Sequence, residues 1–244
     1  LKEGELNTLE VHRELAYTLC DEVEYFTKRL HKKDPSIMVA GLGNRNITPD
    51  SLGPKVVETM IITRHAITDK SLQLELDERL GNVCAVAPGV LGITGIETSE
   101  IVLSLVEKIK PDIVFAIDAL ASRKTSRINT TIQLSDTGIV PGSGVGNRRM
   151  ELSQETLKVP VVSIGVPTVV DALTLAKDLL EKAEGGELEP SLITSISQTC
   201  GADMVVTPKN IDISIKRMAT AISDGLNMAF HKGFDFGDIS EYLM

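Results

Sequence analysis

Short apolar runs alternate with helical stretches along most of the chain. Runs rich in Val, Ile and Ala have the length of strands that are buried on both faces. Between them, apolar residues recur every three or four positions, as they do on helices that cover a sheet. The strand-like runs are 37–42, 83–86, 113–117 and 159–166, with a partly alternating run at 128–134. The helical stretches are 11–30, 54–64, 97–109, 167–180 and 208–230.

This alternation predicts a single α/β domain over residues 1–244. Repeated strand, loop and helix is the pattern of a mainly parallel sheet covered by helices on both faces. Within the domain we expect a helical N-terminal segment at 1–35, a catalytic core at 37–181 and a C-terminal helix at 205–231 packed on that core. The sequence starts at Leu1 with neither an initiator Met nor a signal-peptide pattern, so we expect the natural N-terminus to lie elsewhere.

Composition narrows the possible classes of protein. Hydrophobic residues make up 42% of the 244 residues, which is enough for a sizeable core. The formal net charge of -9 argues against direct binding of nucleic acid, because phosphate contacts need clustered Lys and Arg. No apolar run approaches the roughly 20 residues that a membrane-spanning helix needs, so we expect no membrane partner.

Cysteine and histidine provide no metal or nucleophile signature. The three cysteines are far apart in sequence, so they define neither a disulfide framework nor a paired-cysteine zinc site. The four histidines lie outside any catalytic triad or His-Glu-x-x-His pattern. We interpret His12 and His31 as surface residues, and His65 and His231 as structural ones. We therefore expect no resident metal and no cofactor.

Three carboxylates lie at or just after the ends of predicted strands: Asp50, Asp118 and, less directly, Asp171. Open parallel sheets bind ligands where loops meet at the carboxyl ends of the strands. Asp118 directly follows the apolar run 113–117, and a carboxylate so near a core is costly unless it is hydrogen-bonded or functional. The alternative for each aspartate is a structural role, in which it caps a helix or a turn.

Asp50 and Asp118 together could hydrolyse a peptide bond. Two carboxylates close together do not both ionise easily, so one keeps its proton near neutral pH. The charged one can deprotonate a water while the protonated one polarises the scissile carbonyl. Amides of the glycine-rich loops 89–95 and 142–146 could stabilise the oxyanion. The candidate substrate or oxyanion residues are Asn44, Thr94, Gly95, Ser143, Gly144 and Asp171.

Two glycine motifs leave a binding function open. The segments 41–46 and 142–147 begin like dinucleotide fingerprints, but Asn46 and Asn147 stand where the third glycine belongs. Because a fold does not fix a function, a protein that binds a small molecule or nucleoside on the same scaffold is the alternative from another class.

Five motifs in order resemble the spore germination protease family of endospore-forming bacteria. The similarity covers about 37–180 and resumes at 205–209 through the last helix. The motifs are GLGNRNITPDSLGPK at 41–55, PGVLGITGIET at 88–98, AIDALA at 116–121, PGSGVGN at 141–147 and GVPTVVDA at 165–172.

The resemblance implies an endopeptidase that initiates the degradation of small acid-soluble, DNA-binding spore proteins during germination. It implies a fold similar to that of the hydrogenase maturation endopeptidases, and it places the catalytic aspartates at Asp50 and Asp118. It further implies an atypical aspartic peptidase that is made as a self-cleaving zymogen, assembles as a homotetramer and acts in the cytoplasm of the spore core.

The chain departs from the family pattern at points that bear on mechanism. The hydrogenase enzymes have a histidine near Gly142, where this chain has none, so we expect no stable metal site; a metal-assisted peptidase using the same two acids stays an alternative. The propeptide is not in the sequence, and the stretch 180–205 is shorter than the family's. The family cuts at a glutamate-containing motif, which a partly buried arginine would recognise best. The candidates are Arg45, Arg123, Arg127 and Arg148.

Overall fold

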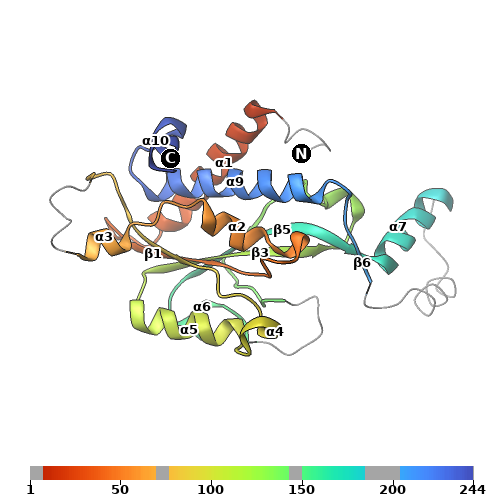
Figure 1. Ribbon diagram of the computed structural model, residues 1–244, viewed down its shortest axis with the longest axis horizontal. Coiled ribbons are helices and arrows are strands. Elements are labelled where there is room, and N and C mark those ends of the chain that lie inside the picture. The colour runs from red at the N-terminus through yellow and green to blue at the C-terminus, as the bar shows by residue number, and fades with distance from the viewer. Residues whose placement is uncertain (1–7, 70–76, 143–149, 185–203, 244) are drawn as a thin grey trace.

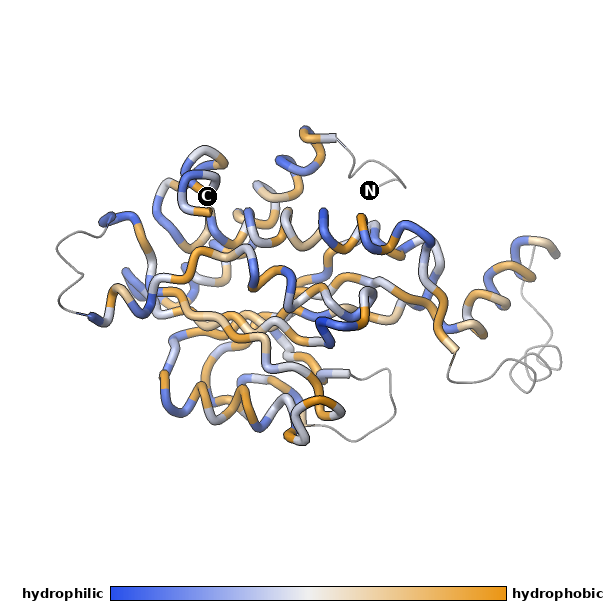
Figure 2. Tube along the Cα trace, in the orientation of Figure 1, coloured by the Kyte–Doolittle hydropathy of each residue, from blue (hydrophilic) through white to orange (hydrophobic). Residues whose placement is uncertain are grey.

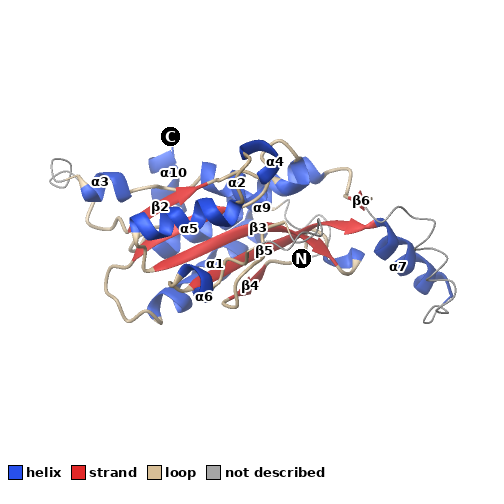
Figure 3. Cartoon of the chain, turned by 90° about the horizontal axis from the view of Figure 1, so that it is seen from below, coloured by secondary structure: helices blue, strands red, loops and turns tan. Residues whose placement is uncertain are grey.

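A mainly parallel sheet forms the centre of the protein, whose computed structural model describes residues 8–69, 77–142, 150–184 and 204–243. The strand order is β2-β1-β3-β5-β4, and β6 pairs with the far end of β5 (Figure 3). The parallel strands are β1 (Ser36–Gly41), β2 (Asn82–Val86), β3 (Ile113–Ser122) and β5 (Val161–Asp171). The antiparallel strands are β4 (Gln133–Ser135) and β6 (Val205–Val206).

Helices cover both faces of this sheet, so the predicted fold class is confirmed (Figure 1). One face carries α1 (Leu9–Lys28), α2 (Leu52–Glu58) and α9 (Ile211–Phe230), with α10 (Phe236–Leu243) packed outside them. The other face carries α4 (Leu91–Thr94), α5 (Thr98–Ile109) and α6 (Gln154–Leu157). The remaining elements are α3 (Arg64–Thr68), α7 (Ala172–Glu184) and the short 3-10 helices η2 (Thr48–Asp50) and η4 (Thr125–Arg127).

The strands are apolar throughout because each one buries side chains on both faces. Successive side chains of a strand point to opposite faces. In β1, Ile37 and Val39 therefore join the cluster beneath α1, α2 and α9, whereas Met38 and Ala40 join the cluster beneath α5. Figure 2 shows the hydrophobic positions concentrated along the sheet between the two helical layers. Phe115 of β3 packs against Phe230 of α9, with ring centroids 5.1 Å apart.

Two predicted boundaries at the carboxyl ends of the strands are wrong. β3 does not stop at residue 117 but continues to Ser122, and β5 continues to Asp171. Consequently, the helix predicted to begin at 167 starts only at Ala172. Each strand is longer than its apolar run because the two strands stay paired with each other. The pairing continues to Ser122 and Val170, with one register shift after Leu120.

The helix predicted over 54–64 is wrong in its second half, because α2 ends at Glu58. The segment that follows is held by Asn227 of α9 instead. The Asn227 side chain accepts a hydrogen bond from the Ile61 N–H (2.9 Å) and donates one to the Thr59 carbonyl (3.2 Å). The predicted strand 128–134 is likewise reduced to β4.

The predicted surface position of His12 is also wrong. Its Nε2 lies 2.7 Å from Asp224 Oδ2, and its side chain is only 17% exposed. The contact joins α1 to α9, which packs along it (Figure 1). His31 is exposed, as predicted.

Helix α2 begins directly on the residue that follows β1 and on the middle of β3. A Cβ atom at Gly53 would overlap the backbone N and O of Leu42 and would lie 2.5 Å from the Ile117 carbonyl oxygen. A Cβ atom at Gly41 would overlap the Gly53 carbonyl oxygen in turn. The absence of side chains here sets how closely α2, and with it η2, approaches the strands.

We expect Gly53→Ala to lower the free energy of unfolding by about 2 kcal/mol or more, because the added methyl group meets backbone atoms that cannot rotate away. Alanine normally favours a helix over glycine, so the sign is informative. The matched control is Gly92→Ala in α4, where a Cβ meets nothing within 4 Å; we expect a change within about 0.5 kcal/mol there. Urea unfolding of both variants measures the difference, and a neutral Gly53→Ala would refute the close contact.

Candidate active site

Asp118 lies in the interior of β3 and is only 5% exposed. Its side chain is on the same face as those of Val114 and Ala116, which belong to the cluster beneath α5. Its Oδ1 accepts a hydrogen bond from the N–H of Ala119 (2.9 Å), and the backbone N–H of Gly142 also donates to this carboxyl group. The side chain is thus a buried acid held by two main-chain amides.

Asp50 approaches Asp118 from a different element. It ends η2, in the loop between β1 and α2, and is half-buried. Its Oδ2 accepts a hydrogen bond from the N–H of Asn44 at 2.7 Å. Gly43, at φ +109°, allows this return of the loop, because a Cβ there would overlap the Asp50 carbonyl oxygen and lie 3.1 Å from Oδ1.

Burial and the charge of Asp50 together keep Asp118 protonated. Burial raises the pKa of Asp118 most, the Asp50 carboxylate raises it further, and the amides of Ala119 and Gly142 oppose both. The result is a pKa of about 8. The charge of Asp50 acts on Asp118, and η2, which Asp50 ends, contacts β3. The structure therefore brings together the two aspartates that the sequence singled out, and Asp118 is an acid at neutral pH.

The structure does not bring Asp171 into this site. Asp118 pairs with Gly165 of β5, and Asp171 lies six residues farther along the same strand. At about 3.3 Å per residue, that is roughly 20 Å away. Asp171 is exposed and pairs with Val205 of β6, so its role as a site residue is not supported.

The other candidate residues have mixed outcomes. Asn44 contacts Asp50, although through its backbone and not its side chain. The Thr94 hydroxyl is engaged within its own turn, where it donates to the Ile96 carbonyl (2.9 Å) and accepts from the Ile96 N–H (3.1 Å). Gly95 ends α4 with φ +72°, and an oxyanion role for either residue stays a prediction. Ser143 and Gly144 lie outside the described residues.

Gly142 makes a contact in the candidate site that sequence reasoning missed. The loop was expected to offer amides to an oxyanion, yet the Gly142 N–H is directed at the Asp118 carboxyl group. Gly142 has a φ of +64°, a conformation that favours glycine. The Pro141-Gly142 pair is therefore the one feature of the sequence that indicated a turn here.

The expected buried arginine is not among the described candidates. Arg45 is 62% exposed and forms an ion pair with Glu58 on the surface (3.2 Å). Arg123 and Arg127 are exposed as well, and Arg148 lies outside the described residues. Recognition of a substrate glutamate therefore has no assigned partner in the part of the chain that the structure describes.

The part of the chain that the structure describes contains no group of three or more His, Cys, Asp and Glu side chains that could hold a metal ion. No helix in these residues has both the length and the apolarity to cross a bilayer.

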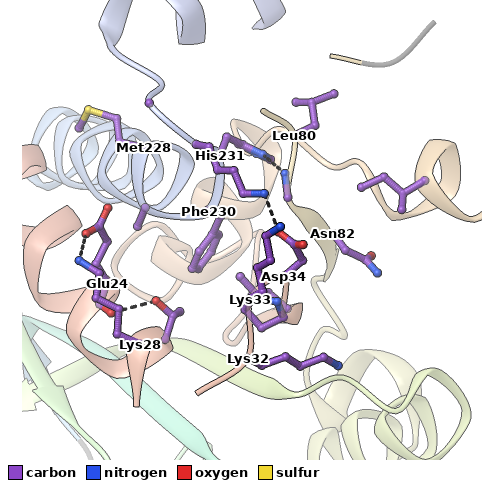
Figure 4. A pocket seen from close by; sticks show the side chains of 18 of the residues that line it. Glu24, Lys28, Lys32, Lys33, Asp34, Leu80, Asn82, Met228, Phe230 and His231 are labelled. Carbon is purple, nitrogen blue, oxygen red and sulfur yellow. Dashed lines mark hydrogen bonds and ion pairs between the residues drawn. The ribbon is translucent and has the colours of Figure 1, made fainter. Parts of the chain in front are cut away.

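A cavity of about 570 Å³ lies at the opposite end of the sheet, near the starts of β1 and β2 (Figure 4). Its rim carries lysines that are partly paired, such as Lys28 with Glu24 and Lys232 with Asp34. His231 lines it, accepting from the Gly81 N–H through Nδ1 (3.1 Å), with Nε2 3.2 Å from the Ile61 carbonyl oxygen. Burial lowers the pKa of His231 to about 4. The histidine is therefore neutral and structural, as predicted.

Comparison with known proteins identifies relatives over nearly the whole chain. A sequence profile of the family described as Germination protease matches residues 5–185 and 181–243. The germination protease of Clostridium acetobutylicum is 44% identical over 251 residues, which cover 94% of this chain and 76% of that protein. The one from Caldanaerobacter subterraneus is 45% identical over 232 residues, covering 87% of this chain and 71% of the relative.

Solved structures resemble the chain only distantly. A [NiFe] hydrogenase maturation protease, HycI of Thermococcus kodakarensis, is 17% identical with a TM-score of 0.41, and the match covers 82% of this chain and 98% of that one. A 5'-methylthioadenosine nucleosidase of Arabidopsis thaliana is 11% identical with a TM-score of 0.40, covering 84% and 100%. Likenesses this weak do not bear on function.

The raised pKa of Asp118 predicts a specific pH dependence of stability. Between pH 3.8 and about 8, folded Asp118 keeps a proton that the unfolded chain has released. The free energy of unfolding therefore falls as pH rises through this window, by up to about 1.4 kcal/mol per pH unit. Asp118→Asn cannot ionise, so we expect its stability to gain on that of the wild type as pH rises.

Urea unfolding at about pH 5 and about pH 7.5 tests this. His231 titrates in both chains, so its contribution cancels in the difference between them. If wild type and Asp118→Asn differ in free energy of unfolding by the same amount at both pH values, Asp118 is ionised in the folded protein.

Proposed function

Because the chain belongs to the germination protease family, and is thus a peptidase of spore germination, we propose that it cuts small acid-soluble, DNA-binding spore proteins with a water activated between Asp50 and Asp118. The observation that carries this proposal is the buried, protonated Asp118 beside the charge of Asp50. An acid and a base side by side are what hydrolysis without a covalent intermediate requires.

In the proposed reaction Asp50 is the base. It is the more exposed of the two, and the Asn44 N–H bound to its Oδ2 favours its charged form. Asp50 takes a proton from water as the water oxygen attacks the scissile carbonyl carbon. Asp118 gives its proton to the carbonyl oxygen, so a neutral tetrahedral diol forms.

The second half of the reaction restores both groups. One hydroxyl of the diol returns its proton to Asp118 as the carbonyl reforms and the C–N bond breaks. The leaving nitrogen takes the proton held by Asp50. Each aspartate thus ends in the state in which it began, and a single water is consumed.

The substrate and the setting are parts of the same proposal. A net charge of -9 favours a basic partner, and DNA-binding proteins are of that kind. From the family resemblance we also propose a self-cleaving zymogen, a homotetramer and action in the cytoplasm of the spore core.

We expect Asp50→Asn and Asp118→Asn each to lower the rate of cleavage of a purified small acid-soluble spore protein by about 100-fold or more, the usual contribution of a general acid or base. Asp171→Asn is the matched control, since this aspartate lies far from the pair, and it should cut like the wild type. Digestion followed by gel and mass spectrometry measures all three. An Asp118→Asn variant that cuts at the wild-type rate would refute the mechanism, whereas loss of wild-type activity with a chelator would favour the metal-assisted alternative.

We expect kcat/KM to fall above about pH 8, roughly tenfold per pH unit, because the free enzyme must keep the Asp118 proton in order to donate it. The measurement is the pH dependence of cleavage of a peptide that has no group titrating between about pH 6 and about pH 10. A rate that stays constant through this range would remove Asp118 as the acid.

A further inference from the structure

β2 forms one edge of the sheet, and its outer side is only partly covered. Thr63 lies against it at one residue: the Thr63 N–H donates to the Val83 carbonyl, and the Val83 N–H donates to Thr63 Oγ1, both at 3.0 Å. Alternate residues of a strand direct their backbone groups to the same side. Ala85 therefore presents its N–H and C=O on this outer edge, where no described residue pairs with them.

Two large apolar side chains are exposed in the segment that follows the carboxyl end of β2. Ile93 in α4 is 59% exposed, and Ile96 in the turn after it is 49% exposed. α4 begins five residues after β2 ends and lies beyond its carboxyl end (Figure 3). A Cβ atom at Gly92 or Gly95, next to these isoleucines in sequence, would meet no described atom within 4 Å.

The edge lies within reach of the aspartate pair. Ala85 pairs with Val39 of β1, and Val39 pairs with Phe115 of β3, three residues before Asp118. With strands about 4.8 Å apart and 3.3 Å per residue, Ala85 lies roughly 14 Å from Asp118. An extended peptide covers that distance in about four or five residues.

We propose that the outer edge of β2 at Ala85, together with Ile93 and Ile96, docks an extended segment of the polypeptide substrate as an added strand. The inference rests on the proposed function, because the occupant is the chain to be cut. An unpaired N–H and C=O on a strand edge match the backbone of any extended peptide, and flanking apolar side chains favour apolar residues at alternate positions. Such docking selects unfolded, apolar stretches of a substrate near the cut.

Ala85→Pro tests the docking directly. Proline removes the outward N–H and blocks the edge, yet it is tolerated in an edge strand when that N–H does not serve the sheet. Ala85→Ser keeps the N–H and is the matched control. With a short synthetic peptide spanning one site cut in a small acid-soluble spore protein, we expect Ala85→Pro to raise KM about tenfold with kcat unchanged, the effect of losing one or two backbone hydrogen bonds.

A second measurement needs no variant of the protein. N-methylation of single amides in the same peptide should raise KM for wild type at alternate positions only, because alternate amides face β2. Equal KM values for Ala85→Pro and Ala85→Ser, or no alternation with N-methylation, would overturn the docking and leave the proposed function standing. A changed molecular mass of Ala85→Pro by light scattering with an unchanged KM would show that the edge pairs copies of this chain, and would also overturn it. If wild type cuts neither protein nor peptide, the proposed function fails, and the docking fails with it.

Discussion

The candidate site depends on the free-energy cost of burying one carboxyl group, that of Asp118. Asp118 lies within a strand whose neighbours are covered by helices on both faces, and in the described part of the chain the groups that act on it are two backbone amides and a second carboxylate. Two amides offset only part of the desolvation, so the group keeps its proton. The same burial that is unfavourable for the charged form makes the side chain an acid at neutral pH.

Asp50 lies close to Asp118 because two glycines, Gly43 and Gly53, allow close backbone contacts around it. Gly53 lets α2 rest on the end of β1 and the middle of β3, and Gly43 lets the loop between β1 and α2 turn back so that the Asn44 N–H reaches the Asp50 carboxyl group. Each contact involves main-chain atoms that cannot move aside. The spacing of the two acids is thus set by the backbone, which holds a site more firmly than mobile side chains do.

Much of this could be predicted from the sequence, for identifiable reasons. Runs such as 37–42 and 113–117 are apolar at every position, which only a sheet covered on both sides explains, and an aspartate directly after such a run is conspicuous. What failed depended on partners distant in sequence. β3 and β5 are longer than their apolar runs because they pair with each other beyond Asp118, and neither end is visible in one segment alone. Asp171 does end its strand, but the extra length of β5 carries it away from Asp118. α2 stops where the Asn227 side chain, 168 residues away from Thr59, binds the Thr59 carbonyl and the Ile61 N–H.

The length of β3 has a consequence for how the activity can be controlled. Asp118 is not the last residue of its strand, since pairing with β5 continues on both sides of it. Residues flanked by ladder on both sides open only with the whole domain, whereas loop residues open locally at much lower free energy. Asp118 therefore stays in place when nearby loops open. In the proposed reaction, control then falls to the loop that carries Asp50 or to the approach of the substrate, because local fraying does not withdraw Asp118.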